Sequence, residues 1–271
     1  MRLTLDTDDR TCRLQSAGKE SLCDLYSKEA FELLTKQWLK TGWNLKYTYC
    51  FTWLGRPIIQ LPEDLVRVQE VIYSVQPDVI VETGTAHGGS AVFYASLCRL
   101  VGRGRVISVD VEIRAHNRRY IESHALSSSI TLIEGDSANA ATFDKVRRLV
   151  GAKESVLVIL DSCHTKEHVG KELELYHTLV TPGSYIVAAD GIMEILNDVP
   201  QGKSGWKADN PAAATLEFAA NHPEFVLEQP RWPFCENNLD QNITYWPKAW
   251  LRRRPCSTGK AGQVEAAAVH P

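Results

Sequence analysis

Short apolar runs alternate with helix-length segments through the middle of this 271-residue chain. Five of these runs are strand candidates, at residues 79–83, 105–110, 130–135, 155–160 and 184–190. Each run is continuously apolar, which is typical of strands that helices cover on both faces. The alternation therefore predicts an α/β fold with a doubly wound, mostly parallel, Rossmann-like sheet and right-handed crossovers.

The segment ahead of these strands is predicted to be helical and aromatic. Apolar residues recur at helical spacing within 21–40, and an aromatic, turn-rich stretch follows them. Pro62 is expected to open the next helix and Pro77 to end it. We interpret residues 1–60 as an N-terminal extension, outside the sheet.

The regular alternation of strands and helices ends after the fifth strand. A polar loop leads to a predicted helix at 211–221, and two further strands are expected around 224–228 and 242–246. We therefore place the catalytic domain at 61–254. The tail, 255–271, has little to bury and is expected to be disordered.

Composition narrows the function classes. The net charge of −3 gives no electrostatic basis for nucleic-acid binding. Seven scattered cysteines without a C-x-x-C pair argue against a disulfide framework and a structural zinc site, and they suit a reducing compartment. No apolar run approaches the ~20 residues of a membrane span, and the N-terminus lacks a signal-peptide pattern. These features predict a soluble cytoplasmic protein without a membrane partner.

The turn after the first strand, VETGTAHGGSA, is the first candidate ligand site. Its glycines let backbone N–H groups approach a ligand, although they could equally serve only a tight turn. The stretch is not G-x-G-x-x-G, because Ala86 interrupts it, and this weakens a dinucleotide interpretation. The cofactor-binding candidates here are Glu82, Gly84, His87, Gly88, Gly89 and Ser90.

The next two strand ends add polar groups at the same edge of the sheet. Asp110 ends the second strand, where its carboxylate can accept both ribose hydroxyls of an adenosine, or else cap the following helix. Asp136 and Ser137 follow the third strand and could bind an adenine edge or cap a helix. A glycine turn, a ribose acid and a polar third strand end together favour S-adenosylmethionine over a phosphate-bearing cofactor.

The fourth strand ends in LDSCHTKEH, which contains the zinc-peptidase spacing H-x-x-E-H. Such a site needs both histidines on one continuous helix. Here His164 falls in the turn before the helix, and Glu167 is predicted to face solvent. We therefore reject the peptidase hypothesis.

Asp161, in the same stretch, is the more informative acid. It ends the fourth strand, and Asp190 ends the neighbouring one, so the two carboxylates can hold Mg²⁺ or Mn²⁺ with water completing the shell. Asp161 and His164 are the catalytic candidates, with His164 as a possible base or merely a helix-capping residue. Residues flanking the crevice could form a lid over a methyl acceptor, although core packing is an alternative for the tryptophans: Trp53, Arg56, Gln60, Trp206, Asp209 and Asn210.

Four stretches carry a resemblance to a known family: TWLGRPIIQLPEDL, PDVIVETGTAHGGSA, LDSCHTKEHVGKELELY and LVTPGSYIVAADG. Together they resemble the cephalosporin-hydroxylase-like family of class I methyltransferases, which includes rhamnosyl O-methyltransferases, over residues 50–254. The resemblance implies S-adenosylmethionine as cofactor and magnesium held by acids at the ends of strands four and five. Many members have Glu-Asp at the fifth strand end, whereas this chain has Ala189-Asp190, which removes one potential ligand.

The leading hypothesis is an S-adenosylmethionine-dependent O-methyltransferase. Its acceptor is expected to be a hydroxyl of a small molecule, a sugar or glycosylated natural product of the kind found in antibiotic biosynthesis. The alternatives are a nicotinamide-dependent oxidoreductase using the same crevice and a methyltransferase-fold assembly protein with weakened chemistry. The N-terminal extension is expected to support a homo-oligomer.

Overall fold

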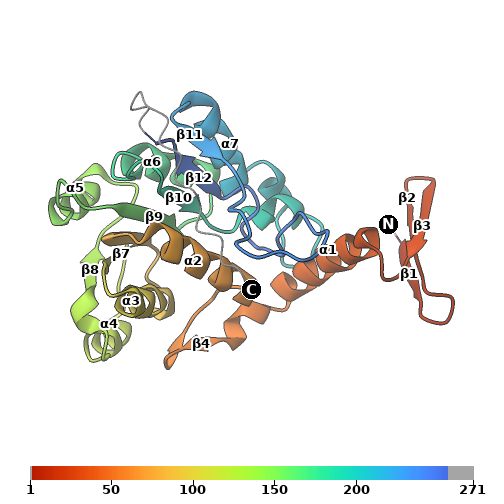
Figure 1. The fold of residues 1–271 in the computed structure, drawn as a ribbon, viewed down its shortest axis with the longest axis horizontal. Coiled ribbons are helices and arrows are strands. Elements are labelled where there is room, and N and C mark those ends of the chain that lie inside the picture. Colours follow the sequence, from red (N-terminus) through yellow and green to blue (C-terminus); the bar gives the residue numbers. More distant parts are fainter. Residues whose placement is uncertain (1, 256–271) are drawn as a thin grey trace.

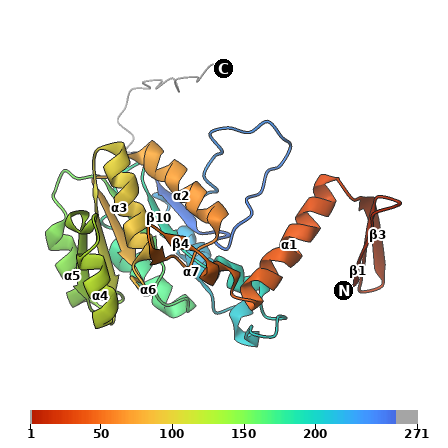
Figure 2. The same ribbon diagram turned by 90° about the horizontal axis from the view of Figure 1, so that it is seen from below.

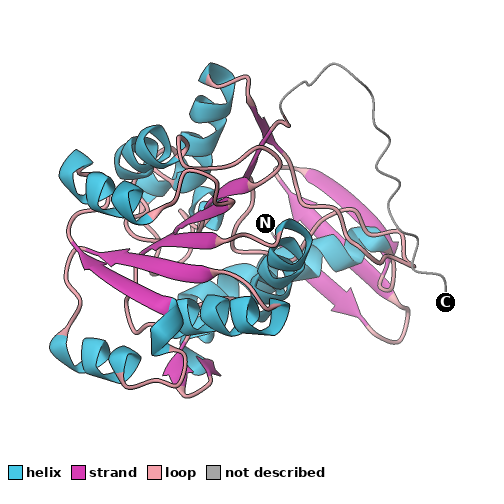
Figure 3. Cartoon of the chain, turned by 60° about the vertical axis from the view of Figure 1, so that its left-hand side comes forward, coloured by secondary structure: helices cyan, strands magenta, loops and turns pink. Residues whose placement is uncertain are grey.

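A seven-stranded sheet forms the centre of the molecule in the computed structural model, which describes residues 2–255 (Figure 3). The strand order is β11-β12-β10-β9-β6-β7-β8. Strands β6 to β10 run parallel, and β12 pairs antiparallel with both β10 and β11. The bounds are β6 Val79–Thr83, β7 Arg105–Asp110, β8 Ile130–Glu134, β9 Val156–Leu160, β10 Tyr185–Ala188, β11 Phe225–Leu227 and β12 Trp250–Arg253. The predicted α/β, mostly parallel sheet is confirmed.

Helices cover both faces of this sheet (Figure 1). One hydrophobic cluster lies under α2 and α3, and a second lies under α5, α6 and α7. Because both faces are covered, β6 and β9 are buried along their whole length. The bounds are α2 Pro62–Val75, α3 Gly89–Val101, α4 Ala115–Glu122, α5 Ala140–Leu149, α6 Lys166–Tyr176 and α7 Pro211–Asn221.

The N-terminal extension differs from its predicted secondary structure. Residues expected to be irregular or helical form an antiparallel meander of β1 (Arg2–Asp6), β2 (Thr11–Ser16) and β3 (Lys19–Asp24). The helix expected within 21–40 is shifted along the chain, to α1 at Lys28–Asn44. Apolar and polar residues alternate in this segment, as at Leu3 and Leu5, which is a strand pattern. Figures 1 and 2 show that the meander stands apart from the sheet, at the end of α1.

The prediction of a last strand at 242–246 was wrong. These residues form a loop, and the strand that pairs with β10 begins four residues later, at Trp250. The backbone of Tyr245 is occupied elsewhere, since its N–H donates to Asp64 of α2 and its carbonyl accepts from Ile192. Most of the tail predicted to be disordered lies outside the described residues.

Several short elements connect the larger ones. A two-stranded ribbon, β4 (Thr52–Trp53) and β5 (Arg56–Pro57), precedes α2. Short 3-10 helices lie at η1 Tyr47–Cys50, η2 Ser127–Ser129, η3 Gly191–Ile195 and η4 Ser204–Lys207. None of the helices described is both long enough and apolar enough to span a bilayer.

Candidate active site

The glycine turn joins β6 to α3 and lies directly against the end of β9. Gly84 has φ +91, and a Cβ there would approach the carbonyl oxygen of Asp161 to 2.0 Å. Only glycine fits this contact, because any side chain would collide with backbone. The Asp161 N–H also donates to the Thr83 carbonyl at 3.0 Å. The ends of β6 and β9 are therefore in contact.

Asp110 lies beside the same turn. Its Oδ2 accepts a hydrogen bond from the Ala86 N–H at 2.9 Å, and its Oδ1 accepts from the Glu112 N–H at 3.2 Å. Ala86 has φ +45, a conformation that costs energy for a residue with a Cβ. The Asp110 carboxylate therefore helps to hold the turn, while its partial exposure leaves it open to a ligand.

Arg56, predicted to contact the acceptor, instead braces the turn from its other side. Its Nε donates to the His87 carbonyl at 2.9 Å, and its Nη2 donates to Asn117 Oδ1 at 3.1 Å. The Asn117 side chain in turn donates to the Ala86 carbonyl at 2.9 Å. With 9% of its surface exposed, Arg56 is committed to the glycine turn.

Glu82 lies beneath the turn. Its side chain is fully buried, and its Oε2 accepts a hydrogen bond from Ser108 Oγ at 2.6 Å. Burial raises the pKa of Glu82 to about 8, because a charged carboxylate is poorly solvated there. Glu82 was predicted to contact the cofactor, but in this conformation it has no surface facing the crevice.

Ser137 belongs to a polar network that also contains the second histidine of the H-x-x-E-H match. Its Oγ lies 3.2 Å from His168 Nε2 and 3.3 Å from Ser162 Oγ, and Ser162 donates to the buried Glu172 at 2.8 Å. His168 Nε2 also lies 3.5 Å from Glu172, and its hydrogen bond with this carboxylate raises the pKa of His168. Asp136, next to Ser137, accepts from the Ala138 N–H, so it shapes this turn locally.

The three residues of the H-x-x-E-H match do not converge on one point. Glu167 is 80% exposed and pairs with Lys171 at 2.7 Å. His164 Nε2 lies 3.5 Å from Asp190, whereas His168 faces the network described above. The two histidines therefore have different partners, which agrees with the rejection of a zinc-peptidase site.

Asp161, His164 and Asp190 form a close group of titratable side chains in the crevice. One ligand atom from each residue lies within 4.8 Å of the others. Burial and the neighbouring Asp190 raise the pKa of Asp161, whereas the Gln60 side chain, which donates to Asp161 Oδ2 at 3.2 Å, acts in the opposite direction. Burial also raises the pKa of Asp190. Asp190 has φ +61, an uncommon backbone conformation often found at functional positions.

This donor set fits a divalent cation. Burial disfavours the charged form of both carboxyl groups, and although His164 lowers the pKa of Asp161, a cation would stabilise both ionised forms further. Neither Ala189 nor Glu194 supplies the third acid implied by the family pattern, because Ala189 lies in the hydrophobic cluster and Glu194 pairs with Lys248 at 2.8 Å. The residues available to hold a metal ion are therefore Asp161, Asp190 and His164, with water completing the shell.

A cavity of about 160 Å³ opens beside Asp190. Gln60 also lines it, and its aromatic walls come from distant parts of the chain: Trp43, Tyr49, Trp206, Tyr245 and Trp246. Trp43 packs edge-on against both Trp206 and Tyr245, with ring centroids 6.3 and 5.3 Å apart. Aromatic walls next to a polar centre suit a ring-shaped acceptor that carries hydroxyl groups.

Of the predicted lid residues, only Gln60 and Trp206 line this cavity. Trp53 donates to Ser96 and packs edge-on against Phe93 of α3, so its role is core packing, the alternative considered from the sequence. Asp209 accepts from the Lys166 N–H at the start of α6. Asn210 caps α7 and donates to the Trp206 carbonyl. Asp209 and Asn210 therefore anchor the loop that carries Trp206.

Asp64 is a positioning residue that the sequence did not reveal. Its carboxylate accepts hydrogen bonds from the Thr244 hydroxyl and the Tyr245 N–H, and it is 4% exposed. Burial raises the pKa of Asp64 to about 8, although these two hydrogen bonds act in the opposite direction. Asp64 thus fixes the loop that brings Tyr245 and Trp246 to the cavity.

A comparison with known families matches residues 45–254 to the model named Rhamnosyl O-methyltransferase/CmcI. The chain belongs to this family. It is 30% identical to the rhamnosyl O-methyltransferase of Mycobacterium leprae over 186 residues, which cover 68% of this chain and 78% of that protein. Membership confirms the expected O-methyltransferase class and favours it over the nicotinamide-dependent alternative.

Solved structures agree on the fold. A CmcI structure described with magnesium and S-adenosylmethionine has a TM-score of 0.50 and 20% identity, covering 76% of this chain and 77% of that chain. MycE, from the mycinamycin biosynthetic pathway and in complex with Mg and S-adenosylhomocysteine, has a TM-score of 0.50 and 15% identity, covering 92% of this chain and 70% of that chain. At these identities the similarity establishes the Rossmann-like methyltransferase fold alone.

Proposed function

We propose that this protein transfers a methyl group from S-adenosylmethionine to a hydroxyl of a small glycosylated acceptor. One observation carries the proposal: Asp161, His164 and Asp190 meet between the glycine turn and an aromatic cavity. A cofactor bound along the turn would lie next to an acceptor ring in the cavity. The similar proteins named as rhamnosyl O-methyltransferase and as a mycinamycin-pathway enzyme support a sugar-bearing natural product of secondary metabolism, such as an antibiotic, as the acceptor class.

Each group has a distinct role in this proposal. The exposed part of the Asp110 carboxylate would bind the ribose hydroxyls, and the backbone of residues 84–90 would bind the rest of the cofactor. Asp161 and Asp190 would hold Mg²⁺ or Mn²⁺, with His164 replacing the missing third acid. Such an ion supplies charge that orients a hydroxyl and lowers its pKa.

Methyl transfer is an in-line displacement at the sulfonium methyl group. The acceptor oxygen forms the new C–O bond as the C–S bond breaks, and the hydroxyl proton leaves. Trp206 and Trp43 would position the acceptor ring, and a carboxylate or imidazole at the centre would receive the proton. Gln60, which donates to Asp161, would hold that carboxylate in place.

Cofactor choice is the most direct test. We expect calorimetry to show binding of S-adenosylmethionine and S-adenosylhomocysteine but not of NAD. Asp110→Ala should weaken S-adenosylhomocysteine binding by about 1.5–3 kcal/mol, the typical value of hydrogen bonds to a charged group. Binding of NAD with no signal from either sulfur cofactor would contradict the proposal.

Two variants sharpen this experiment. Asp110→Asn keeps an acceptor for the Ala86 N–H, so it separates turn geometry from ribose binding. Asp144→Ala removes an exposed acid that pairs only with Arg147, and it should bind cofactor as the parent does. Equal affinity of Asp110→Ala and the parent would show that the ribose assignment is wrong.

We also infer a homo-oligomer formed through residues 2–44, a segment that we name the N-terminal arm. Its meander stands apart from the sheet, and Leu22 and Tyr26 are 56% and 77% exposed. Apolar surface of this kind is often covered by a second copy. Deleting residues 1–26 should lower the mass measured by analytical ultracentrifugation to that of a smaller assembly. A parent chain that sediments as a monomer would contradict this inference.

We also propose that the protein is cytoplasmic. The six cysteines of residues 2–255 are unpaired, which suits a reducing compartment.

A further inference from the structure

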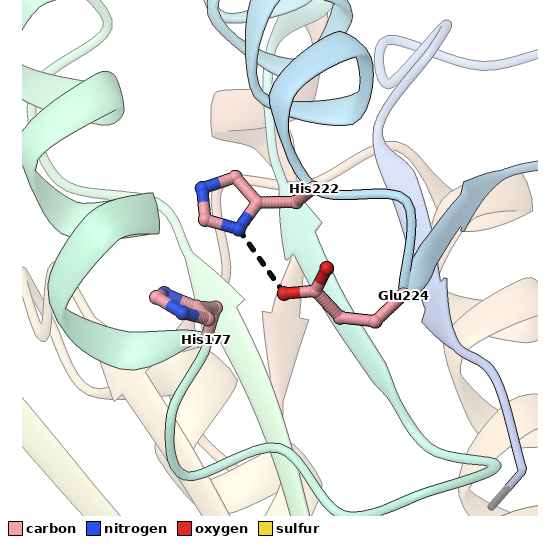
Figure 4. A group of neighbouring side chains, drawn as sticks. All are labelled: His177, His222 and Glu224. Atoms are coloured by element: carbon pink, nitrogen blue, oxygen red, sulfur yellow. Dashed lines mark hydrogen bonds and ion pairs between the residues drawn. The ribbon is translucent and has the colours of Figure 1, made fainter.

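A second group of metal-ligating side chains lies at the opposite edge of the sheet. His177 follows α6, His222 follows α7, and Glu224 precedes β11 (Figure 4). One ligand atom from each residue lies within 4.8 Å of the others. Because α6 starts at the crevice and has 11 residues, its far end is about 16 Å away at 1.5 Å per residue. This group is therefore separate from Asp161, His164 and Asp190.

Hydrogen bonding leaves one nitrogen of His177 free to bind a metal ion. Its Nδ1 lies 3.0 Å from the Leu173 carbonyl oxygen. A carbonyl only accepts, so Nδ1 carries the proton and Nε2 keeps its lone pair. Zinc-binding histidines usually have this arrangement, in which the other ring N–H donates to a carbonyl or carboxylate.

His222 has an equivalent outer partner. Its Nε2 lies 3.1 Å from Glu174, and its Nδ1 lies 3.1 Å from Glu224. If Nε2–H donates to Glu174, then Nδ1 can face a metal ion together with Glu224. The proton now shared between Nδ1 and Glu224 would leave to solvent when the ion binds.

Aromatic packing holds both imidazole rings in place. Phe218 stacks on His222 with ring centroids 3.9 Å apart and an interplanar angle of 14°. Phe225 packs edge-on against His177 at 6.1 Å. The His222 side chain is only 19% exposed, so its ring cannot swing freely away. A site with fixed ligands loses little entropy when it binds its ion.

We propose that His177, His222 and Glu224 bind a zinc-class divalent ion, with Glu174 as an outer carboxylate. Two imidazoles and one carboxylate form a recognised ligand set for zinc, and water would complete a tetrahedral shell. The ion would join the ends of α6 and α7 to the start of β11. It would act by linking these elements and would take no direct part in methyl transfer, because the crevice lies at the other edge of the sheet.

Zinc binding to metal-free protein tests this proposal. We expect Co²⁺ to give the visible spectrum of a four-coordinate site and Zn²⁺ to displace it. His177→Ala and Glu224→Gln should each weaken Zn²⁺ binding by at least the ~10–100-fold that loss of an outer partner costs. Zn²⁺ should also raise the melting temperature of the parent more than that of either variant, since it binds the folded state.

Two matched variants separate this site from the crevice. His116→Ala removes an exposed histidine and should leave the cobalt spectrum unchanged. Asp161→Asn should also retain the spectrum, because it alters only the crevice. The proposal is overturned if Asp161→Asn abolishes the cobalt signal, or if His177→Ala and Glu224→Gln bind Zn²⁺ as the parent does. In either case the group is a set of ion pairs in which a protonated His222 contacts Glu174 and Glu224.

Discussion

Asp161→Asn is expected to lower turnover by more than ~10–100-fold, the usual effect of losing even an outer partner of a metal ligand. Asn keeps the size of Asp and an oxygen that can accept from Gln60, so the fold should be retained. It removes the charge that, with Asp190, would hold the ion. Methyl transfer measured with added Mg²⁺ or Mn²⁺, and again with chelator, checks this result.

The metal response of the parent gives the prediction a second readout. Both carboxyl groups have raised pKa values, so protons compete with the ion for the same oxygens. The metal concentration for half-maximal activity should therefore increase as the pH falls. Asp161→Asn should lose most of this response. A variant with full activity and an unchanged metal requirement would exclude Asp161 from the site.

The strands of the sheet were predictable because helices cover both of its faces. Such strands are apolar at every position, and the observed bounds of β6 and β7 equal the predicted ones. The meander was missed because its apolar residues alternate and remain largely exposed, as Leu5 does at 47%. The alternation was present in the sequence, and the turn at Ala17-Gly18 could have separated β2 from β3.

The strand expected at 242–246 was wrong for a different reason. Ile243, Thr244 and Tyr245 have high strand propensity, yet their polar groups bond to Asp64 and to the backbone after β10. Whether such a segment joins a sheet depends on partners far away in the sequence. No local pattern indicates that an acid on α2 will hold this loop.

Part of the candidate site was likewise predictable from the sequence, and part was not. The common location of Asp110, Asp161 and Asp190 could be predicted because acids at the ends of parallel strands meet at one edge of the sheet. Arg56 was predicted to contact the acceptor, whereas its guanidinium donates to the His87 carbonyl, a contact that joins segments 31 residues apart. The cavity walls were largely missed, because Trp43 and Tyr245 approach each other only after α1 packs against the 242–246 loop.

Replacing His164 distinguishes a metal ligand from a general base. Its Nε2 lies 3.5 Å from Asp190, and one ligand atom of His164 lies within 4.8 Å of one of Asp161, so we assign it to the metal shell. His164→Ala should then raise the metal concentration for half-maximal activity, by roughly 10–100-fold on the scale of metal-site substitutions. Saturating Mn²⁺ should restore most of the turnover. His116→Ala, an exposed histidine outside the crevice, should change neither quantity.

A general base would behave differently. If His164 removes the acceptor proton directly, His164→Ala should lower turnover by roughly 10²–10⁴-fold, and excess metal should not restore it. Full activity of the parent in chelator, together with that severe loss, would exclude the metal mechanism. Asp190 would then orient the imidazole of His164, because its carboxylate is the acid that lies next to Nε2. The two mechanisms thus make opposite predictions for one variant measured with and without metal.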